Sequence, residues 1–402
     1  MQRSDILKKA THVVLKFGTG VLTEHIEKRS QAYFGAIAKE CLALQKQGKK
    51  VIIVSSGAVG FGRAILKERN KIVLPKASVS EKQALASLGQ SLLIETYRTS
   101  FAKNKLAAAQ VLLTRTDFEN KLHLQNLKAT LAQLLDWGAV PVINENDTVS
   151  VEELKFGDND TLAGMAVDLV EAELLVILTD IDGLYTADPR KDPQASRIPE
   201  VFGIDPATLG LAGDSSSGVG TGGMATKLRA ASRAGESGVP TLIAPGKQVG
   251  VLDRALSGEP LGTFVHAPAQ RGTGSRKRWL LRDLRPLGQV VIDDGAARAL
   301  CERGKSLLPT GIRDVRGTFE AGEPVEILSL AGTALARGFS SYGSDELRRI
   351  VGVKTADIPV VLGFKLADEA VHRDDLVLLS PSGARAETTG AQVAAGATKE
   401  RG

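Results

Sequence analysis

Cysteine is scarce in this sequence, which has only two cysteines among its 402 residues. Cys41 and Cys301 lie far apart, and each falls in an amphipathic helical pattern. The sequence therefore supports neither a disulfide framework nor a cysteine-rich metal site, and we expect both side chains to be thiols in the core. Aromatic residues are also few, at 4% of the chain, which leaves little material for stacking on nucleic-acid bases.

Long apolar runs are missing from the sequence as well. The longest purely aliphatic run covers residues 174–178, far fewer than the roughly 20 residues that cross a membrane. The opening residues lack the apolar segment and the cleavage site of a secretory signal. We therefore expect a cytoplasmic protein without a membrane partner. The net charge of +5 is mild for this length, and it permits small anions or nucleic acid as partners without requiring either.

Short β-branched runs alternate with longer segments of helical periodicity from the start to about residue 260. This alternation is typical of an α/β domain, which we place at residues 8–262. Nearly continuous hydrophobic runs predict buried parallel strands at residues 13–16, 51–55, 107–113, 140–143, 174–179 and 241–244. One helix is predicted to begin at Ser80, with Gln83 completing a capping-box pattern, and another to span about residues 221–236.

The composition changes after Gly262. Residues 263–280 include a polar, basic stretch with glycine and proline, and we interpret them as a linker. Short alternating segments and one helix follow, so residues 281–366 are predicted to form a small β-barrel-like domain. Residues 380–402 are small and polar without aromatics, which predicts a disordered tail.

Two glycine-rich turns follow predicted strands, KFGTG at residues 16–20 and SSGAVG at residues 55–60. Such turns let backbone N–H groups approach phosphate oxygens, and a neighbouring lysine adds positive charge. Because ligands of open α/β sheets bind at the carboxyl ends of strands, the two turns mark one crevice. A tight strand-to-helix turn would use the same residues, so the first turn does not decide the function alone.

A third glycine-rich loop, GVGTGGMATK at residues 218–227, runs into a predicted helix whose N-terminus can receive an anion. A lysine is locally unfavourable there, which favours a functional role for Lys227. Together with Lys16 it would supply the positive charge that a transferring phosphoryl group needs. Another strand ends at Thr179-Asp180, although a surface loop is the simpler interpretation of that pair by itself.

Acids and amides alternate twice within residues 143–160, as Asn144-Glu145-Asn146-Asp147 and as Asp158-Asn159-Asp160. A solvated loop would explain the polarity but not this alternation. An amino-acid substrate offers an ammonium group that carboxylate and amide oxygens can bind. We therefore interpret the stretch as the loop that holds the acceptor in a phosphoryl-transfer site.

These segments resemble the glutamate 5-kinase branch of the amino acid kinase family. KFGTG, VSSGAVG, VINENDTV, GDND, LTDIDGLYTADPR and GVGTGGMATK match the family's segments in order and interval, and the resemblance covers about residues 10–375. NEND followed by GDND points to this branch rather than to the carbamate, aspartate or acetylglutamate kinases. The second domain resembles a PUA domain. The implied fold is an open, mainly parallel sheet sandwiched by helices, plus the small PUA domain.

The resemblance implies ATP-dependent phosphorylation of the γ-carboxylate of L-glutamate to γ-glutamyl phosphate, with Mg²⁺. This reaction is the first step of proline biosynthesis, and the family's members are feedback-inhibited by proline. The resemblance further implies a homo-oligomer that hands its product to a glutamyl phosphate reductase.

The resemblance assigns three catalytic residues. Lys16 and Lys227 would stabilise the transferring phosphoryl group, and Asp160 would hold and orient both lysines. It assigns no residue as a metal ligand. The family's first loop usually continues Gly-Thr-Ser, whereas this chain has Gly18-Thr19-Gly20. The departure puts a hydroxyl contact at position 20 in doubt but leaves the backbone cradle intact, because glycine suits close approach.

The resemblance also assigns two ligand sites. The glutamate-binding residues are Ser56, Asp147 and Asn159, with Asn144 and Glu145 in support. The nucleotide-binding residues are Lys16, Gly18, Thr19, Thr179, Asp180, Thr221, Gly222, Gly223, Met224, Ala225, Thr226 and Lys227.

Two alternatives stay open. The chain could be an RNA-binding protein acting through its PUA-like domain, where the run Arg276-Lys277-Arg278-Trp279 could meet phosphates. We favour a structural or regulatory role for that domain, which makes nucleic acid the disfavoured partner. The chain could also be a related kinase for a different acid, and residues 144–160 argue against that.

Overall fold

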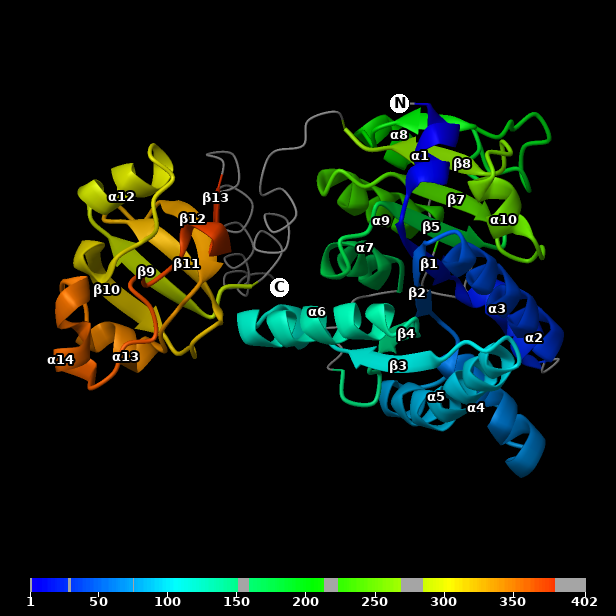
Figure 1. Cartoon of the computed structure of the whole chain (residues 1–402), viewed down its shortest axis with the longest axis horizontal. Coiled ribbons are helices and arrows are strands. Elements are labelled where there is room, and N and C mark those ends of the chain that lie inside the picture. The colour runs from blue at the N-terminus through cyan, green and yellow to red at the C-terminus, as the bar shows by residue number, and fades with distance from the viewer. Residues whose placement is uncertain are drawn as a thin grey trace, which may run out of the picture. The chain divides into compact units, whose positions relative to one another are not determined.

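A computed structural model describes the chain at residues 2–27, 30–74, 76–150, 159–212, 223–268 and 285–379. The chain separates into two compact units, Met1–Trp279 and Leu280–Gly402 (Figure 1). Within the described ranges no helix is long and apolar enough to cross a membrane. The expected tail, the basic run at residues 276–279 and most of the expected linker lie outside the described residues.

The first unit is built on a sheet that, in the described chain, has eight strands in the order β3-β4-β2-β1-β5-β7-β8-β6 (Figure 1). Neighbouring strands are parallel except for β7 and β8. The strands are β1 (His12–Phe17), β2 (Lys50–Ser55), β3 (Ala108–Leu113), β4 (Val140–Glu145), β5 (Leu174–Thr179), β6 (Glu200–Phe202), β7 (Thr241–Pro245) and β8 (Thr263–His266). All six predicted strands are present, which confirms the expected open, mainly parallel sheet.

Helices cover both faces of this sheet. On one face α5 packs against α3 and α4, and on the other α7 packs against α6 and α9 (Figure 1). The helices are α1 (Arg3–Lys9), α2 (Thr19–Glu27), α3 (Gln31–Lys46), α4 (Ala58–Ile65), α5 (Val79–Ala102), α6 (Lys121–Asp136), α7 (Asn159–Leu169), α8 (Pro206–Gly210), α9 (Met224–Glu236) and α10 (Val251–Leu256). A π-helical turn at Leu66–Asn70 lies between α4 and α5, and a 3₁₀ turn at Arg115–Phe118 lies between β3 and α6.

Strand alternation decides which helix layer each side chain of β1 meets. Val13, Leu15 and Phe17 belong to the hydrophobic core that includes residues of α3 and α5. All three are at most 1% exposed, and burial of each contributes about 1.5–3 kcal/mol. Because successive side chains of a strand point to opposite faces, Lys16 points to the face that α7 and α9 cover.

Helix α5 begins one residue before the predicted start and has a different capping box. The Ser78 hydroxyl accepts from the backbone N–H of Glu81 at 3.3 Å, and the Glu81 carboxylate accepts from the backbone N–H of Ser78 at 2.7 Å. The predicted box of Ser80 and Gln83 was wrong. The sequence pattern did not distinguish Ser78 from Ser80, because each is followed three residues later by Glu or Gln. Gln83 is engaged in a different contact, described below with the site.

The described part of the second unit contains a five-stranded sheet in the order β10-β9-β11-β12-β13. Its strand pairs are antiparallel except for β9 and β11. The strands are β9 (Gly288–Ile292), β10 (Ile312–Gly317), β11 (Pro324–Ser329), β12 (Ala334–Phe339) and β13 (Leu376–Leu378), and the helices are α12 (Asp294–Cys301), α13 (Ser344–Arg349) and α14 (Ile358–Leu362). Buried residues from this sheet and these helices form a separate core.

Three details differ from the sequence expectations. Strand β8 occupies residues 263–266 of the expected linker, because Phe264 packs in the core of the first unit. Strand β13 pairs with β12 beyond residue 366, the expected end of the small domain. Cys41 is buried as expected, but Cys301 is exposed, because α12 is a short helix whose buried residue is Leu300.

Candidate active site

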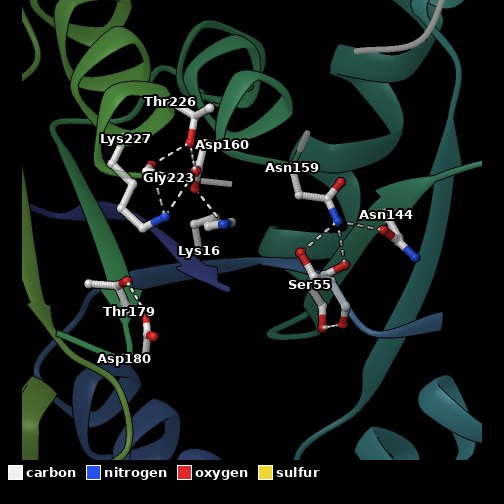
Figure 2. A network of polar contacts seen from close by, with 11 residues as sticks. Lys16, Ser55, Asn144, Asn159, Asp160, Thr179, Asp180, Gly223, Thr226 and Lys227 are labelled. Atoms are coloured by element: carbon white, nitrogen blue, oxygen red, sulfur yellow. Dashed lines mark hydrogen bonds and ion pairs between the residues drawn. The ribbon is translucent and has the colours of Figure 1, made fainter. Parts of the chain in front are cut away.

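The carboxyl ends of β1, β2, β4 and β5 carry most of the polar residues singled out in the sequence. Helix α7 begins at this edge with the adjacent residues Asn159 and Asp160. Figure 2 shows that their side chains join two separate sets of contacts, Asp160 with two lysines and Asn159 with Ser55 and Asn144. One helix start therefore organises two clusters of different chemistry.

The charged cluster consists of Lys16, Asp160, Thr226 and Lys227. Lys16 Nζ forms an ion pair with Asp160 Oδ1, and Lys227 Nζ lies 3.3 Å from Asp160 Oδ2. Thr226 Oγ1 donates to the same oxygen at 2.7 Å. Asp160 is fully buried, and both lysines are at most 5% exposed. Strand β1 and helices α7 and α9 thus bring together residues that are far apart in the sequence.

The electrostatics of this cluster keep Asp160 ionised. Burial by itself would raise its pKa, but Lys16 and then Lys227 outweigh burial and hold the pKa of Asp160 below its ordinary value. Two ammonium groups against one carboxylate leave an excess positive charge in a place largely shielded from water. Such a charge interacts strongly with an anion, because a low local dielectric screens it little.

The start of α9 positions Lys227. The Gly223 carbonyl oxygen lies 2.8 Å from Thr226 Oγ1 and accepts from Lys227 Nζ at 3.4 Å. Met224 and Ala225 form the first turn of the helix with them, whereas residues 221–222 lie outside the described chain. A lysine in the first turn is opposed by the helix dipole, and the Asp160 carboxylate offsets that cost.

The turn after β1 leaves space beside the Lys16 ammonium. Gly18 N–H donates to the Leu178 carbonyl at 3.1 Å, which ties the turn to β5. A Cβ on Gly18 would lie 3.6 Å from Lys16 Nζ and 3.4 Å from the same carbonyl oxygen. Thr19 then begins α2. A side chain at position 18 would therefore lie in van der Waals contact with the Lys16 ammonium, and glycine leaves that space free.

The end of β5 lies next to the same turn. Thr179 Oγ1 donates to Asp180 Oδ1 at 3.1 Å (Figure 2). A Cβ on Gly20 would lie 3.3 Å from Asp180 Cγ, so the glycine that replaces the family's usual serine gives room to this carboxylate. The structure thus brings the expected nucleotide residues of β1 and β5 together.

The amide cluster consists of Ser55, Ser56, Gln90, Asn144 and Asn159. Asn159 Nδ2 donates to the Ser55 carbonyl at 3.1 Å and to Ser56 Oγ at 3.0 Å. Asn144 Oδ1, at 2.9 Å, is a third acceptor within reach of the two N–H donors of this nitrogen. Asn144 Nδ2 in turn donates to Gln90 Oε1 at 2.8 Å. The cluster carries no formal charge and is held by the direction of its hydrogen bonds.

The loop after β4 is fastened from within and from α5. Ser150 Oγ donates to Glu145 Oε1 at 2.7 Å, and Gln83 Nε2 donates to the Ser150 carbonyl at 3.1 Å. The Glu145 side chain therefore takes part in the hydrogen bonds that fasten the loop. Asp147 is half-buried in the same loop. Asp158, from the second acid-amide group, lies outside the described residues.

The sequence interpretation did not single out the residues that α5 contributes. Gln83, Ser87 and Gln90 lie one helical turn apart along one face of this helix and all reach the β4 segment and its loop. Ser87 Oγ is 2.8 Å from Thr148 Oγ1. The spacing of these three polar residues could have been recognised in the sequence, because polar side chains along one face of a partly buried helix need hydrogen-bond partners in a neighbouring element.

Comparison with known proteins identifies the two units. The model of the amino acid kinase family matches residues 11–245, and the PUA domain model matches residues 288–362. A glutamate 5-kinase of Trichlorobacter lovleyi is 46% identical over 380 residues, which cover 94% of this chain and 100% of that protein. A glutamate 5-kinase of Thermus thermophilus is 49% identical over 371 residues, or 92% of this chain and 97% of that protein. The chain therefore belongs to the amino acid kinase family, in the group of the glutamate 5-kinases.

Proposed function

We propose that this chain transfers the γ-phosphoryl group of ATP to the γ-carboxylate of L-glutamate and so forms γ-glutamyl phosphate, the first step of proline biosynthesis. The observation that carries the proposal is the buried Lys16–Asp160–Lys227 arrangement, which sits one residue from Asn159 and its amide cluster. The first set suits a phosphoryl group and the second suits an amino acid. The names of the relatives support the same substrates.

The charged cluster accounts for the chemistry. Negative charge spreads over the phosphoryl oxygens during transfer, so the site needs aligned positive charge rather than a covalent partner. Lys16 and Lys227 supply that charge from opposite elements, β1 and α9. Asp160 holds both ammonium groups in place and lowers their mutual repulsion. The lysines are therefore oriented before the reaction begins.

The amide cluster and its loop account for the acceptor. In this proposal Ser56, Asn159 and Asp147 bind glutamate, with Asn144 and Glu145 in support. The Asp147 carboxylate and the Asn159 carbonyl oxygen are acceptors for the substrate's ammonium group, while hydroxyl donors such as Ser56 suit a carboxylate. The γ-carboxylate would then meet the phosphoryl group at the start of α7.

The residues present fit ATP. Gly18 leaves space beside Lys16, and the neighbouring Thr179 and Asp180 end β5 at the same edge. ATP, when bound, supplies the phosphoryl group. The described ranges hold no group of three or more His, Cys, Asp or Glu side chains suited to a metal ion. Magnesium is commonly held by substrate phosphates, waters and one or two carboxylates, so we propose that Mg²⁺ enters with the nucleotide.

We extend the proposal to partners and regulation. Proline shares the α-carboxylate and a cationic amine with glutamate, so it is suited to compete as a feedback inhibitor. The product is an acyl phosphate, which water hydrolyses, and its proposed consumer is a glutamyl phosphate reductase. A cytoplasmic location and a homo-oligomeric state complete the proposal.

ATP consumption in parallel assays with glutamate, aspartate, acetylglutamate, and bicarbonate plus ammonia tests the function. Hydroxylamine traps the acyl phosphate, and each assay is repeated with proline. We expect hydroxamate to form with glutamate and with none of the other acids. We also expect proline to suppress its formation. Turnover with another acid but not glutamate would move the chain to a different substrate, and no turnover with any acid would overturn the kinase assignment.

A further inference from the structure

We propose that Gln90 is a positioning residue for the acceptor. Its side-chain oxygen fixes the direction of the Asn144 and Asn159 amides, so that Asn159 Oδ1 is presented to the ammonium group of a free amino acid. The inference rests on the proposed function, because it assigns a further residue to the same site. Gln90 lies in α5 and is 54 residues from Asn144 in the sequence.

The direction of the amide chain is set at its inner end. The Ser55 carbonyl oxygen can only accept a hydrogen bond, so the Asn159 side chain must turn its NH₂ group toward it. The Asn144 side chain lies 2.9 Å from the same NH₂ group, so it turns its oxygen inward and its nitrogen outward, because an inward nitrogen would place donor against donor. The outward nitrogen of Asn144 needs an acceptor in its turn, and Gln90 Oε1 supplies it at 2.8 Å.

Without an acceptor at position 90, the Asn144 amide would lose the partner that holds its direction. Asn144 is only 2% exposed, so water is a poor substitute for that partner and an unpaired NH₂ group there is costly. Rotation of the Asn144 amide would place its NH₂ group against that of Asn159, donor against donor. These hydrogen-bonded amides therefore transmit a change at α5 to the start of α7.

The direction of Asn159 matters because its two ends have opposite chemistry. The nitrogen, with its two N–H donors, faces three acceptor atoms, and the oxygen points away from them (Figure 2). An ammonium group has three N–H donors and no acceptor, so it can bind the oxygen but not the nitrogen. A rotated Asn159 would present donors to a cation. We therefore expect Gln90 to act on acceptor binding and not on the nucleotide.

Three variants of α5 test this role. Gln90→Met keeps the length of the side chain but removes the acceptor, and Gln90→Ala is a second acceptor-free variant should Met misfold. Gln90→Glu keeps an acceptor oxygen for the Asn144 amide, and its ionised carboxylate has no N–H to donate. Ser91→Ala, at the next position of the same helix, is the matched control, because the Ser91 hydroxyl is exposed and donates to the Leu88 carbonyl within α5. Hydroxamate formation gives KM for glutamate and for ATP, and glutamate protection against thermal unfolding reports binding without turnover.

We expect Gln90→Met to raise KM for glutamate roughly tenfold, the usual weight of one buried hydrogen bond, with KM for ATP within about twofold. Gln90→Glu and Ser91→Ala should stay within about threefold of the unchanged chain. A folded Gln90→Met that keeps the original KM for glutamate would overturn this inference and leave the proposed function standing. A Gln90→Glu as impaired as Gln90→Met would do the same. If the unchanged chain forms no hydroxamate with glutamate, the proposed function falls, and the inference falls with it.

Discussion

The charged cluster and the amide cluster start from neighbouring residues, Asp160 and Asn159, but different forces hold them. The charged cluster is a buried group of two cations and one anion, in which each charge acts on the others whatever its orientation. The amide cluster is neutral, and it depends on which end of each side chain faces its neighbour. In the proposed function, charge gives strength to the phosphoryl side of the site, whereas hydrogen-bond direction gives selectivity to the acceptor side. Changes to the first cluster should therefore cost more than changes to the second.

Asp160→Asn, in the charged cluster, should have the largest effect on stability and activity. The substitution leaves Lys16 and Lys227 buried without a counter-charge, and loss of one partner from a buried ion pair typically costs about 3–5 kcal/mol. We expect the free energy of unfolding to fall by about that amount, together with most of the activity. Urea unfolding at pH 7 measures the loss. Asp188→Asn, which removes an exposed pair with Arg190, is the control and should change little, so equal losses in both variants would contradict the assignment.

Low pH should reduce the difference in stability between Asp160→Asn and the unchanged chain. The pKa of Asp160 is lowered in the folded state, so its ionisation stabilises the fold above the unfolded-state pKa, about 3.9. That contribution is lost as the pH falls through the folded-state pKa. Unfolding midpoints measured from pH 7 down to pH 3 should therefore converge at the acid end. A constant gap over this range would show that the ion pairs are not its source.

Lys227→Ala should have the next largest effect and should act on turnover. Removal of one aligned donor to a transition state costs about 3 kcal/mol, or roughly 10²-fold or more in rate. The glutamate-dependent hydroxamate assay measures it, with Lys247→Ala, at an exposed lysine after β7, as the control. A fall below threefold in a correctly folded Lys227→Ala would count against the role of Lys227.

Asn144→Leu should show that the amide cluster serves only the acceptor. Leucine has a similar volume but removes one hydrogen bond to Asn159 and one to Gln90. We expect KM for glutamate to rise by roughly thirtyfold, as the loss of about 1 kcal/mol for each of the two hydrogen bonds implies, while KM for ATP stays within about twofold. A parallel rise in both constants would mean that the two clusters are not separate in function.

The sequence predicted the charged cluster better than the amide cluster, and the reason is local structure. Lys16 and Lys227 each follow or begin a glycine-rich turn, and Asp160 lies in a short acid-amide segment, so each carries a local sign of its role. Gln90 has none, because its partner Asn144 is reached only when α5 packs beside β4. Contacts between a helix and a distant strand depend on the fold, which local patterns do not encode.

The capping box of α5 illustrates a second limit of sequence patterns. Ser78 with Glu81 and Ser80 with Gln83 both fit the pattern of a serine followed three residues later by Glu or Gln. In the structure Gln83 is committed to the Ser150 carbonyl, so the first pair caps the helix. A choice between equal local patterns is settled by a contact 67 residues away.

Gly20→Ser, which restores the family's usual residue, should have the smallest effect and would sharpen the comparison. The added Cβ would lie 3.3 Å from Asp180 Cγ, but Asp180 is exposed and can shift by a few tenths of an ångström. The change lies beside the charged cluster without altering its charges, so we expect KM for ATP and the turnover rate to stay within about threefold. Steady-state kinetics with ATP varied at saturating glutamate measure both. A change of tenfold or more would show that the phosphoryl side, like the acceptor side, depends on exact shape as well as on charge.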